Sequence, residues 1–145
     1  MFKFDHIAIQ TDDFENTVRW YKNFFSCEEN WTLTSFSDLT LKRLPSITKI
    51  VELQVGSLKF HIFDINGDNS TVTSNAIQYQ HVCVEVPDID RLKEIRNRWL
   101  NLYQSGIYKF KKNEFATDIV TDKDGISVFY CFDVNGLEFE VMHKP

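Results

Sequence analysis

The sequence predicts an α+β fold built from two βαβββ modules, and an internal repeat is the first observation that predicts it. The stretch Phe4–Tyr21 reads FDHIAIQTDDFENTVRWY, and QHVCVEVPDIDRLKEIRNRW at 80–99 overlays it without a gap, so that His6 falls on His81. Both stretches alternate with period two and then change to helical spacing. A repeated strand–helix unit of this kind indicates a duplicated module.

The second observation is that each strand–helix unit is followed by further strand-like segments. Alternating or β-branched runs are separated by turn signals such as Gly56-Ser57. We expect a single domain over 1–145, with module 1 at about 1–66, module 2 at about 78–145, and a curved mixed sheet around a cleft with the helices outside. The predicted strands after the helices are 27–34, 49–55 and 58–65 in module 1, and 110–121, 126–132 and 137–143 in module 2; 35–45 and 66–75 are predicted loops.

In module 1, residues 3–10 form the first predicted strand. Ile7 and Ile9 lie on one face of it, and His6 and Gln10 lie on the other. Thr11 and Asp12 are predicted N-caps, because Glu15 follows Asp12 by three residues as in a capping box. A helix over about 13–25 is then expected to cover the isoleucine face, which leaves the histidine on the opposite face.

Module 2 repeats this order, with a strand over 80–86, a turn at Pro87-Asp88 and a helix that ends near Gly106. The apolar stripe of that helix recurs at helical spacing. In the last strand, alternate apolar residues are expected to face the helix, so that the glutamates between them share the histidine side. The stripe consists of Leu92, Ile95, Trp99 and Leu102, and the last strand alternates Leu137, Phe139 and Val141 with Glu138, Glu140 and Met142.

Composition limits the classes of function. A chain of 145 residues that is 43% hydrophobic is long enough for one well-filled core. The net charge of −5 argues against a nucleic-acid surface or an anionic membrane as a partner. Three widely spaced cysteines are typical of reduced thiols, and the chain has neither a spanning apolar run nor a signal peptide, so we expect a cytoplasmic protein.

The predicted strand faces opposite the apolar side gather imidazole and carboxylate groups from several strands. Such donors suit zinc, iron, nickel, manganese or cobalt, and a transition metal requires that they converge. Only four histidines are present, and three of them lie on polar strand faces, whereas His143 is expected to be a bystander near the C-terminus. The donor-bearing positions are His6, Glu52, His61, His81, Glu85, Glu138 and Glu140.

These features together resemble the vicinal oxygen chelate superfamily, which includes glyoxalase I, extradiol dioxygenases and bleomycin-resistance proteins. The resemblance rests on DHIAI, VRWYKNFF, QHVCVEV and the closing DVNGLEFEV, in that order along nearly the whole chain. It implies metal ligands at His6 and His81 on the two first strands, at His61 where the family often has Glu, and at Glu140 through the DPxGxxxE pattern. Val134 in place of proline, and Phe25-Ser26 in place of Leu-Gly, leave the subfamily unassigned.

The residues leave two ligand sets open. If His61 binds, three imidazoles and one carboxylate leave about two open positions on an octahedral ion, which is enough for a chelating substrate. If it does not bind, His6, His81 and Glu140 form a two-histidine-one-carboxylate triad suited to iron(II) and oxygen, with His61 as a nearby acid–base group.

Three functions follow as expectations. The first is a metal-dependent lyase or isomerase, with Glu52 as the catalytic base for a small oxygenated substrate. The second is an iron(II)-dependent dioxygenase, and the third is a metal-free ligand-binding protein of the bleomycin-resistance kind. The resemblance also implies a homodimer. The residues expected to contact the substrate are Gln10, Gln54, Phe63 and Tyr130.

Overall fold

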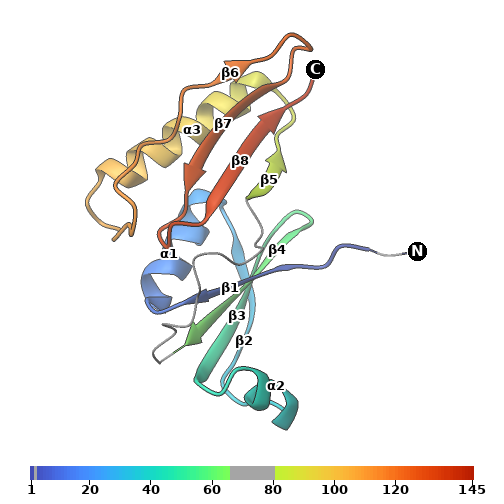
Figure 1. Ribbon diagram of the computed structural model, residues 1–145, viewed down its shortest axis with the longest axis vertical. Coiled ribbons are helices and arrows are strands. Elements are labelled where there is room, and N and C mark those ends of the chain that lie inside the picture. Colours follow the sequence, from blue (N-terminus) through green and yellow to red (C-terminus); the bar gives the residue numbers. More distant parts are fainter. Residues whose placement is uncertain (2, 66–80) are drawn as a thin grey trace, which may run out of the picture. The chain divides into compact units, whose positions relative to one another are not determined.

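A computed structural model of the chain describes residues 1, 3–65 and 81–145 (Figure 1). The chain divides into two compact units, Met1–Ala76 and Ile77–Pro145. Each unit contains one four-stranded mixed sheet, and the order of elements confirms the predicted α+β class with two βαβββ modules. The predicted loop at 66–75 and the first residue of the predicted strand 80–86 lie outside the described residues.

In unit 1 the strand order is β1-β4-β3-β2, with β1 parallel to β4 and the other neighbours antiparallel. The parallel pair is the one that brings the two ends of the module together. The elements are β1 (Ile7–Thr11), α1 (Phe14–Phe24), β2 (Glu28–Leu33), α2 (Asp38–Arg43), β3 (Ile47–Val55) and β4 (Leu58–Ile65).

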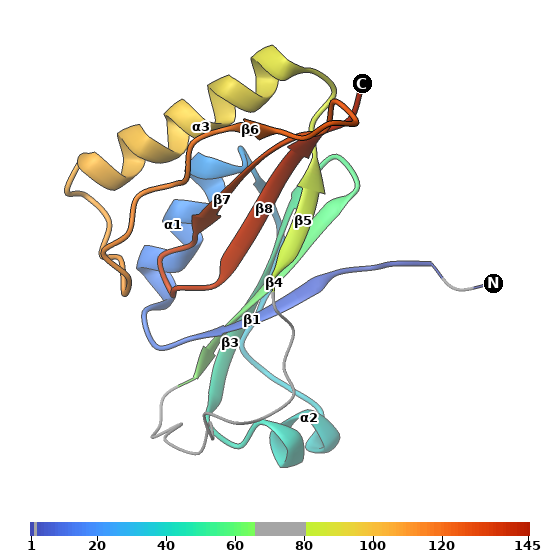
Figure 2. The same cartoon turned by 45° about the horizontal axis from the view of Figure 1, so that its top comes forward.

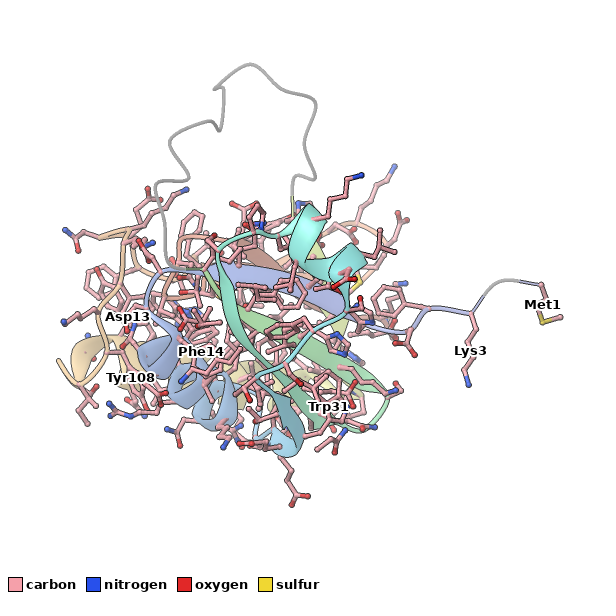
Figure 3. The ribbon with its side chains drawn as sticks, turned by 90° about the horizontal axis from the view of Figure 1, so that it is seen from below. Met1, Lys3, Asp13, Phe14, Trp31 and Tyr108 are labelled. Carbon is pink, nitrogen blue, oxygen red and sulfur yellow. The ribbon has the colours of Figure 1, made fainter. Side chains whose placement is uncertain are left out.

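Helix α1 starts one or two residues later than the sequence pattern indicates. Asp13, not Thr11 or Asp12, is its N-cap, and the Asp13 side chain accepts a hydrogen bond from the backbone N–H of Asn16 at 3.4 Å. The reason is that Thr11 is still the buried last residue of β1, where its Oγ1 accepts from the Asp13 N–H at 3.0 Å. Figure 3 shows Asp13 and Phe14 side by side at this end of the helix.

The core of unit 1 lies between α1 and the apolar face of its sheet. Trp20, Tyr21 and Phe24 of α1 and Phe60 and Ile62 of β4 are each 0% exposed. The rings of Tyr21 and Phe60 meet edge-on with centroids 4.8 Å apart. Burial of each such side chain contributes about 1.5–3 kcal/mol. This face of β4 is therefore committed to the core, and its alternate residues face the other way.

The region predicted as a loop at 35–45 contains the short helix α2. Ser37 is its N-cap, and its hydroxyl accepts a hydrogen bond from the backbone N–H of Thr40 at 3.2 Å. Leu39 and Leu41 are exposed, so the segment lacks the buried apolar stripe by which a helix is recognised in a sequence.

In unit 2 the strand order is β5-β8-β7-β6. As in unit 1, the first and last strands of the unit, β5 and β8, are parallel neighbours, and the other neighbours are antiparallel. Helix α3 lies against the sheet and contacts β7 and β8 (Figure 2). Its N-cap is Asp88, which lies in the predicted turn at Pro87-Asp88, and Gly106 follows its end with a φ of 71°. The elements are β5 (Val82–Glu85), α3 (Ile89–Gln104), β6 (Val120–Thr121), β7 (Ser127–Phe132) and β8 (Glu138–His143).

The strand predicted over 110–121 was wrong for most of its length, because only Val120 and Thr121 form a strand. Thr117, just before them, makes a single backbone hydrogen bond to the Tyr130 carbonyl at 2.9 Å, and side chains supply its other hydrogen bonds. The Thr117 carbonyl accepts a hydrogen bond from Arg96 Nε of α3 at 2.6 Å, and the Thr117 hydroxyl accepts one from the Tyr130 N–H at 2.9 Å. In the described part of the chain, no helix is long and apolar enough to cross a membrane.

Candidate metal centre

Two predicted ligands of unit 1 meet as a pair of stacked imidazoles. His6 directly precedes β1, and His61 lies in β4, where it is the Cα partner of Ala8. Because Ala8 and His6 are two residues apart, all three positions share one face of the parallel pair. The two rings are 3.7 Å apart between centroids, with planes inclined by 12°. The strand pairing therefore delivers two nitrogen donors to one place.

Glu52 holds His61 from the neighbouring strand. The two residues are Cα partners across β3 and β4, and His61 Nε2 lies 2.7 Å from Glu52 Oε2. The indole of Trp31, labelled in Figure 3, meets the His61 ring edge-on at 5.0 Å. Stacking, edge contact and hydrogen bond fix the imidazole from three directions.

Asn30 holds Glu52 in turn. Its Nδ2 donates to Glu52 Oε1 at 2.7 Å and to Gln54 Oε1 at 2.6 Å. The Asn30 hydrogen bond is the largest cause that lowers the pKa of Glu52, and the His61 contact adds to it while burial opposes it. The Glu52 side chain is therefore an ionised carboxylate at neutral pH, although only 9% of it is exposed.

His6 also contacts a carboxylate, but through its other ring nitrogen. Its Nδ1 lies 2.8 Å from Asp5 Oδ2, and Lys59 Nζ lies 3.6 Å from Asp5 Oδ1. The hydrogen bond to His6 is the largest cause that lowers the pKa of Asp5. A carboxylate that binds the far nitrogen of a metal-ligating histidine is a common arrangement at metal centres.

The predicted ligands of unit 2 form an equivalent pair. His81 directly precedes β5, and its Nε2 lies 2.9 Å from Glu140 Oε2 of β8, whereas Glu138 lies 3.7 Å from Nδ1. Glu140 is the Cα partner of Cys83, two residues after the histidine. Two donor atoms bound at right angles to one ion, each at about 2.1 Å, would be about 3 Å apart. The 2.9 Å between His81 Nε2 and Glu140 Oε2 therefore fits two ligands of one metal.

The two pairs therefore occupy matching positions in their sheets. His61 is the Cα partner of Ala8, which follows His6 by two residues. In the same way, Glu140 is the Cα partner of Cys83, which follows His81 by two residues. Within the described residues, no group of three or more His, Cys, Asp or Glu side chains is assembled for a metal. Each unit supplies two donors, and their chemistry fits a divalent transition metal.

The other predicted site residues differ in the contacts that they already make within the protein. Gln10 is exposed and is the Cα partner of the half-buried Phe63. Tyr130 meets the His81 ring edge-on at 5.8 Å. Gln54 is engaged with Asn30 and donates from Nε2 to the Gly56 carbonyl at 2.7 Å. These positions stay predictions as substrate contacts.

Sequence reasoning missed Asp5 and Asn30 and did not connect Trp31 with His61. The Asp5-His6 dipeptide was a usable signal, because a carboxylate next to a ligand histidine can bind its far nitrogen. Asn30 carries no such signal, since only the register of β2 on β3 brings it to Glu52, and that register is shifted between Glu29 and Trp31. His143, which was expected to be a bystander, contacts the Val86 carbonyl at 3.4 Å.

Solved structures similar to this chain define the class of fold. A glyoxylase/bleomycin resistance protein/dioxygenase domain from Frankia sp. EAN1pec has 12% identity and a TM-score of 0.74, covering 100% of this chain and 93% of that chain. Lactoylglutathione lyase from Agrobacterium tumefaciens has 17% identity and a TM-score of 0.61, covering 97% and 92%. No protein-family model and no curated protein matches the chain.

A genomically encoded fosfomycin resistance protein from Listeria monocytogenes, complexed with Mn(II) and sulfate, has 16% identity and a TM-score of 0.63, covering 100% of this chain and 94% of that chain. These are glyoxalase, bleomycin resistance and dioxygenase proteins of the vicinal oxygen chelate superfamily. The chain therefore has the fold of that superfamily, as the sequence resemblance predicted.

Proposed function

We propose that the protein is a divalent-metal-dependent lyase or isomerase that acts on a small oxygenated substrate. The observation that supports this is the repeated donor pair: each module has a histidine before its first strand and a second donor on the adjacent parallel strand, at the same register. His6, His61, His81 and Glu140 would supply three imidazoles and one carboxylate. Zinc, iron, nickel, manganese or cobalt would accept this set.

The proposal requires both donor pairs to reach one ion, from one chain or from the two chains of the homodimer that we also propose. Four protein ligands would leave two positions of an octahedral ion for neighbouring oxygens of the substrate. When bound, the ion would act as a Lewis acid for a substrate oxygen on which charge develops.

Glu52 is the proposed proton acceptor. Both of its oxygens already accept hydrogen bonds, from Asn30 and His61, but each oxygen keeps a further lone pair for a substrate proton. The same contacts lower its pKa, so the carboxylate is charged but is a weaker base than one tuned toward neutrality. Glu52→Gln should lower turnover about 10²- to 10⁴-fold. Full turnover in this variant would exclude Glu52 as the base.

Residues beside the donor pairs are proposed to contact the substrate. Gln10 and Phe63 face each other across β1 and β4, further along the pair that carries His61. Tyr130 lies against the His81 ring, and burial, together with the charges of Glu140 and Glu138, raises its pKa. Its hydroxyl is therefore a neutral hydrogen-bond donor at neutral pH. Gln54 is proposed as a contact beside Asn30.

Metal content tests the proposal directly. We would purify the protein anaerobically without added metal and measure the metal bound per chain, in the wild type and in His6→Ala, His81→Ala and Glu140→Ala. Each variant should lose most of the metal, because each removes one of a small set of ligands. His143→Ala is the matched control and should keep it. Protein that holds no metal, or whose metal survives loss of both His6 and His81, would favour metal-free ligand binding instead.

An iron(II)-dependent dioxygenase is the second candidate, because His6, His81 and Glu140 alone would make a two-histidine-one-carboxylate triad suited to iron(II). His61, whose Nε2 lies 2.7 Å from Glu52, would then serve as an acid–base group beside that triad. Iron(II) as the bound metal, with oxygen consumed during turnover, would support the dioxygenase. Turnover that proceeds without oxygen would support the lyase or isomerase.

A further inference from the structure

The stacked histidines of unit 1 contact carboxylates through different ring nitrogens. His6 uses Nδ1, at 2.8 Å from Asp5, and His61 uses Nε2, at 2.7 Å from Glu52. The carboxyl groups of aspartate and glutamate are ordinarily ionised at neutral pH. An ionised carboxylate only accepts hydrogen bonds, so the ring nitrogen that faces it must carry the proton.

A neutral imidazole carries one ring proton, so these contacts also define where its lone pair lies. Protonation of His6 at Nδ1 leaves the lone pair on Nε2, and protonation of His61 at Nε2 leaves it on Nδ1. The parallel stack at 3.7 Å suits two neutral rings, because two positively charged rings at that separation would repel each other.

We propose that Asp5, and Glu52 held by Asn30, are positioning residues that keep His6 and His61 in opposite tautomers. His6 then presents the lone pair of Nε2, and His61 presents that of Nδ1. This assignment does not require a metal. That these two nitrogens would face a metal ion rests on the proposed function.

Asn30 makes the His61 assignment the firmer of the two. Gln54 Nε2 donates to the Gly56 carbonyl, so Gln54 Oε1 faces Asn30, whose Nδ2 then donates to both Gln54 and Glu52. Glu52 Oε1 is thereby occupied, and Oε2 is directed to His61. The Glu52 side chain is 9% exposed and that of Asp5 is 69% exposed, so competition from water is weaker at Glu52.

Nuclear magnetic resonance of the metal-free protein tests the assignment. Long-range proton–nitrogen correlation of ¹⁵N-histidine-labelled chain at pH 8 distinguishes a protonated ring nitrogen from one with a lone pair. The signals are assigned by their loss in His6→Gln and His61→Gln. We expect a protonated Nδ1 in His6 and a protonated Nε2 in His61. The opposite pattern at His61, or the same tautomer in both rings, would overturn the proposal.

Glu52→Gln should invert the tautomer of His61 alone. Asn30 would keep the new amide oxygen, so the amide nitrogen would donate to His61 Nε2 and move the ring proton to Nδ1. Glu28→Gln is the matched control: it makes the same change at an exposed position of β2 and should leave both rings unaltered. An unchanged His61 tautomer in a folded Glu52→Gln protein would contradict the proposal.

Asn30→Ala provides a second variant that keeps the carboxylate. In this variant the proton–nitrogen correlations of His61 should change from those of one tautomer to an average of both. Correlations identical to those of the wild type would show that Asn30 is not a positioning residue. Asp5→Asn should alter His6 only and weaken zinc binding about 10- to 100-fold. If the wild type shows the expected tautomers but binds no metal, the proposed function fails and this inference stands.

Discussion

Asp133→Ala should destabilise unit 2 much more than Asp122→Ala, although both residues have the same place in a D-x-x-G turn. Asp133 Oδ1 accepts hydrogen bonds from the backbone N–H groups of Asn135 and Leu137, each at 2.8 Å. Asp122 Oδ1 accepts from Asp124 at 2.8 Å and from Ile126 at 3.0 Å. Asp133 is 0% exposed, whereas Asp122 is exposed. The two backbone hydrogen bonds match, Asp133 Oδ2 also accepts one from Asn135 Nδ2 at 3.5 Å, and burial differs.

The magnitude follows from that difference. Loss of a hydrogen bond to a charged group costs about 1.5–3 kcal/mol where water cannot replace it, so two such bonds at Asp133 should cost about 3–6 kcal/mol. Water can replace the carboxylate at the exposed turn, where we expect a loss of about 1 kcal/mol. Asp133→Asn keeps an acceptor oxygen without the charge and should fall between the two.

Urea unfolding at pH 7, followed by tryptophan fluorescence, measures these differences, since Trp99 is buried in the same unit. The free energy of unfolding of each variant is compared with that of the wild type. Equal losses for Asp133→Ala and Asp122→Ala, within about 0.5 kcal/mol, would refute the reasoning from burial, because that is the scatter expected for independent surface changes.

Two further predictions concern Trp99 and the cysteines. Trp99→Phe keeps a ring beside Tyr103 but removes the N–H that donates to the Phe132 carbonyl at 2.8 Å. It should therefore lower the free energy of unfolding by about 1–3 kcal/mol. Urea unfolding measures this loss, with Trp31→Phe as a partly exposed control. Cys83 should react with a thiol reagent in the native protein, whereas Cys27 and Cys131, which are buried, should react only after unfolding; equal labelling of all three would contradict their burial. Burial raises the pKa of Cys27 to about 12 in the folded protein, whereas a thiol of the unfolded chain ionises near pH 8.5. The contribution of this thiol to stability is therefore present below about pH 8.5 and declines as the pH rises toward 12. Cys27→Ala should therefore reduce the loss of stability between pH 7 and pH 10, and an unaltered loss would argue against that shift.

The repeat and the strand faces could be predicted from the sequence because burial imposes a period on them. Phe60 and Ile62 are buried where the alternation of β4 placed them, and His61 between them faces the other way. The segment at 110–121 misled because its β-branched and aromatic residues mimic a strand. Its carbonyl at Thr117 is instead bonded by Arg96 of α3, a contact between residues 21 positions apart that no local pattern encodes.

The candidate site was predictable as a set of residues but not as a set of contacts. His6, His61, His81 and Glu140 were identified from strand faces and from resemblance to a family. Their pairing within each unit follows from the parallel pairs β1–β4 and β5–β8, which the structure shows. The roles of Asp5 and Asn30 depend on which ring nitrogen or carboxylate oxygen each one touches, and atomic detail of that kind is not specified by residue type or spacing.

The His61–Glu52 contact also has a consequence for the charge balance of the module. The family resemblance implies Glu at the fourth-strand ligand position. This chain has His61 there, and the carboxylate of Glu52 lies one strand away, 2.7 Å from the imidazole. A carboxylate therefore lies next to this position, on the adjacent strand β3. A divalent ion held by His61 would therefore have one carboxylate fewer among its direct ligands than an ion held by Glu at this position, and an anionic substrate oxygen would compete with one carboxylate fewer for the same ion.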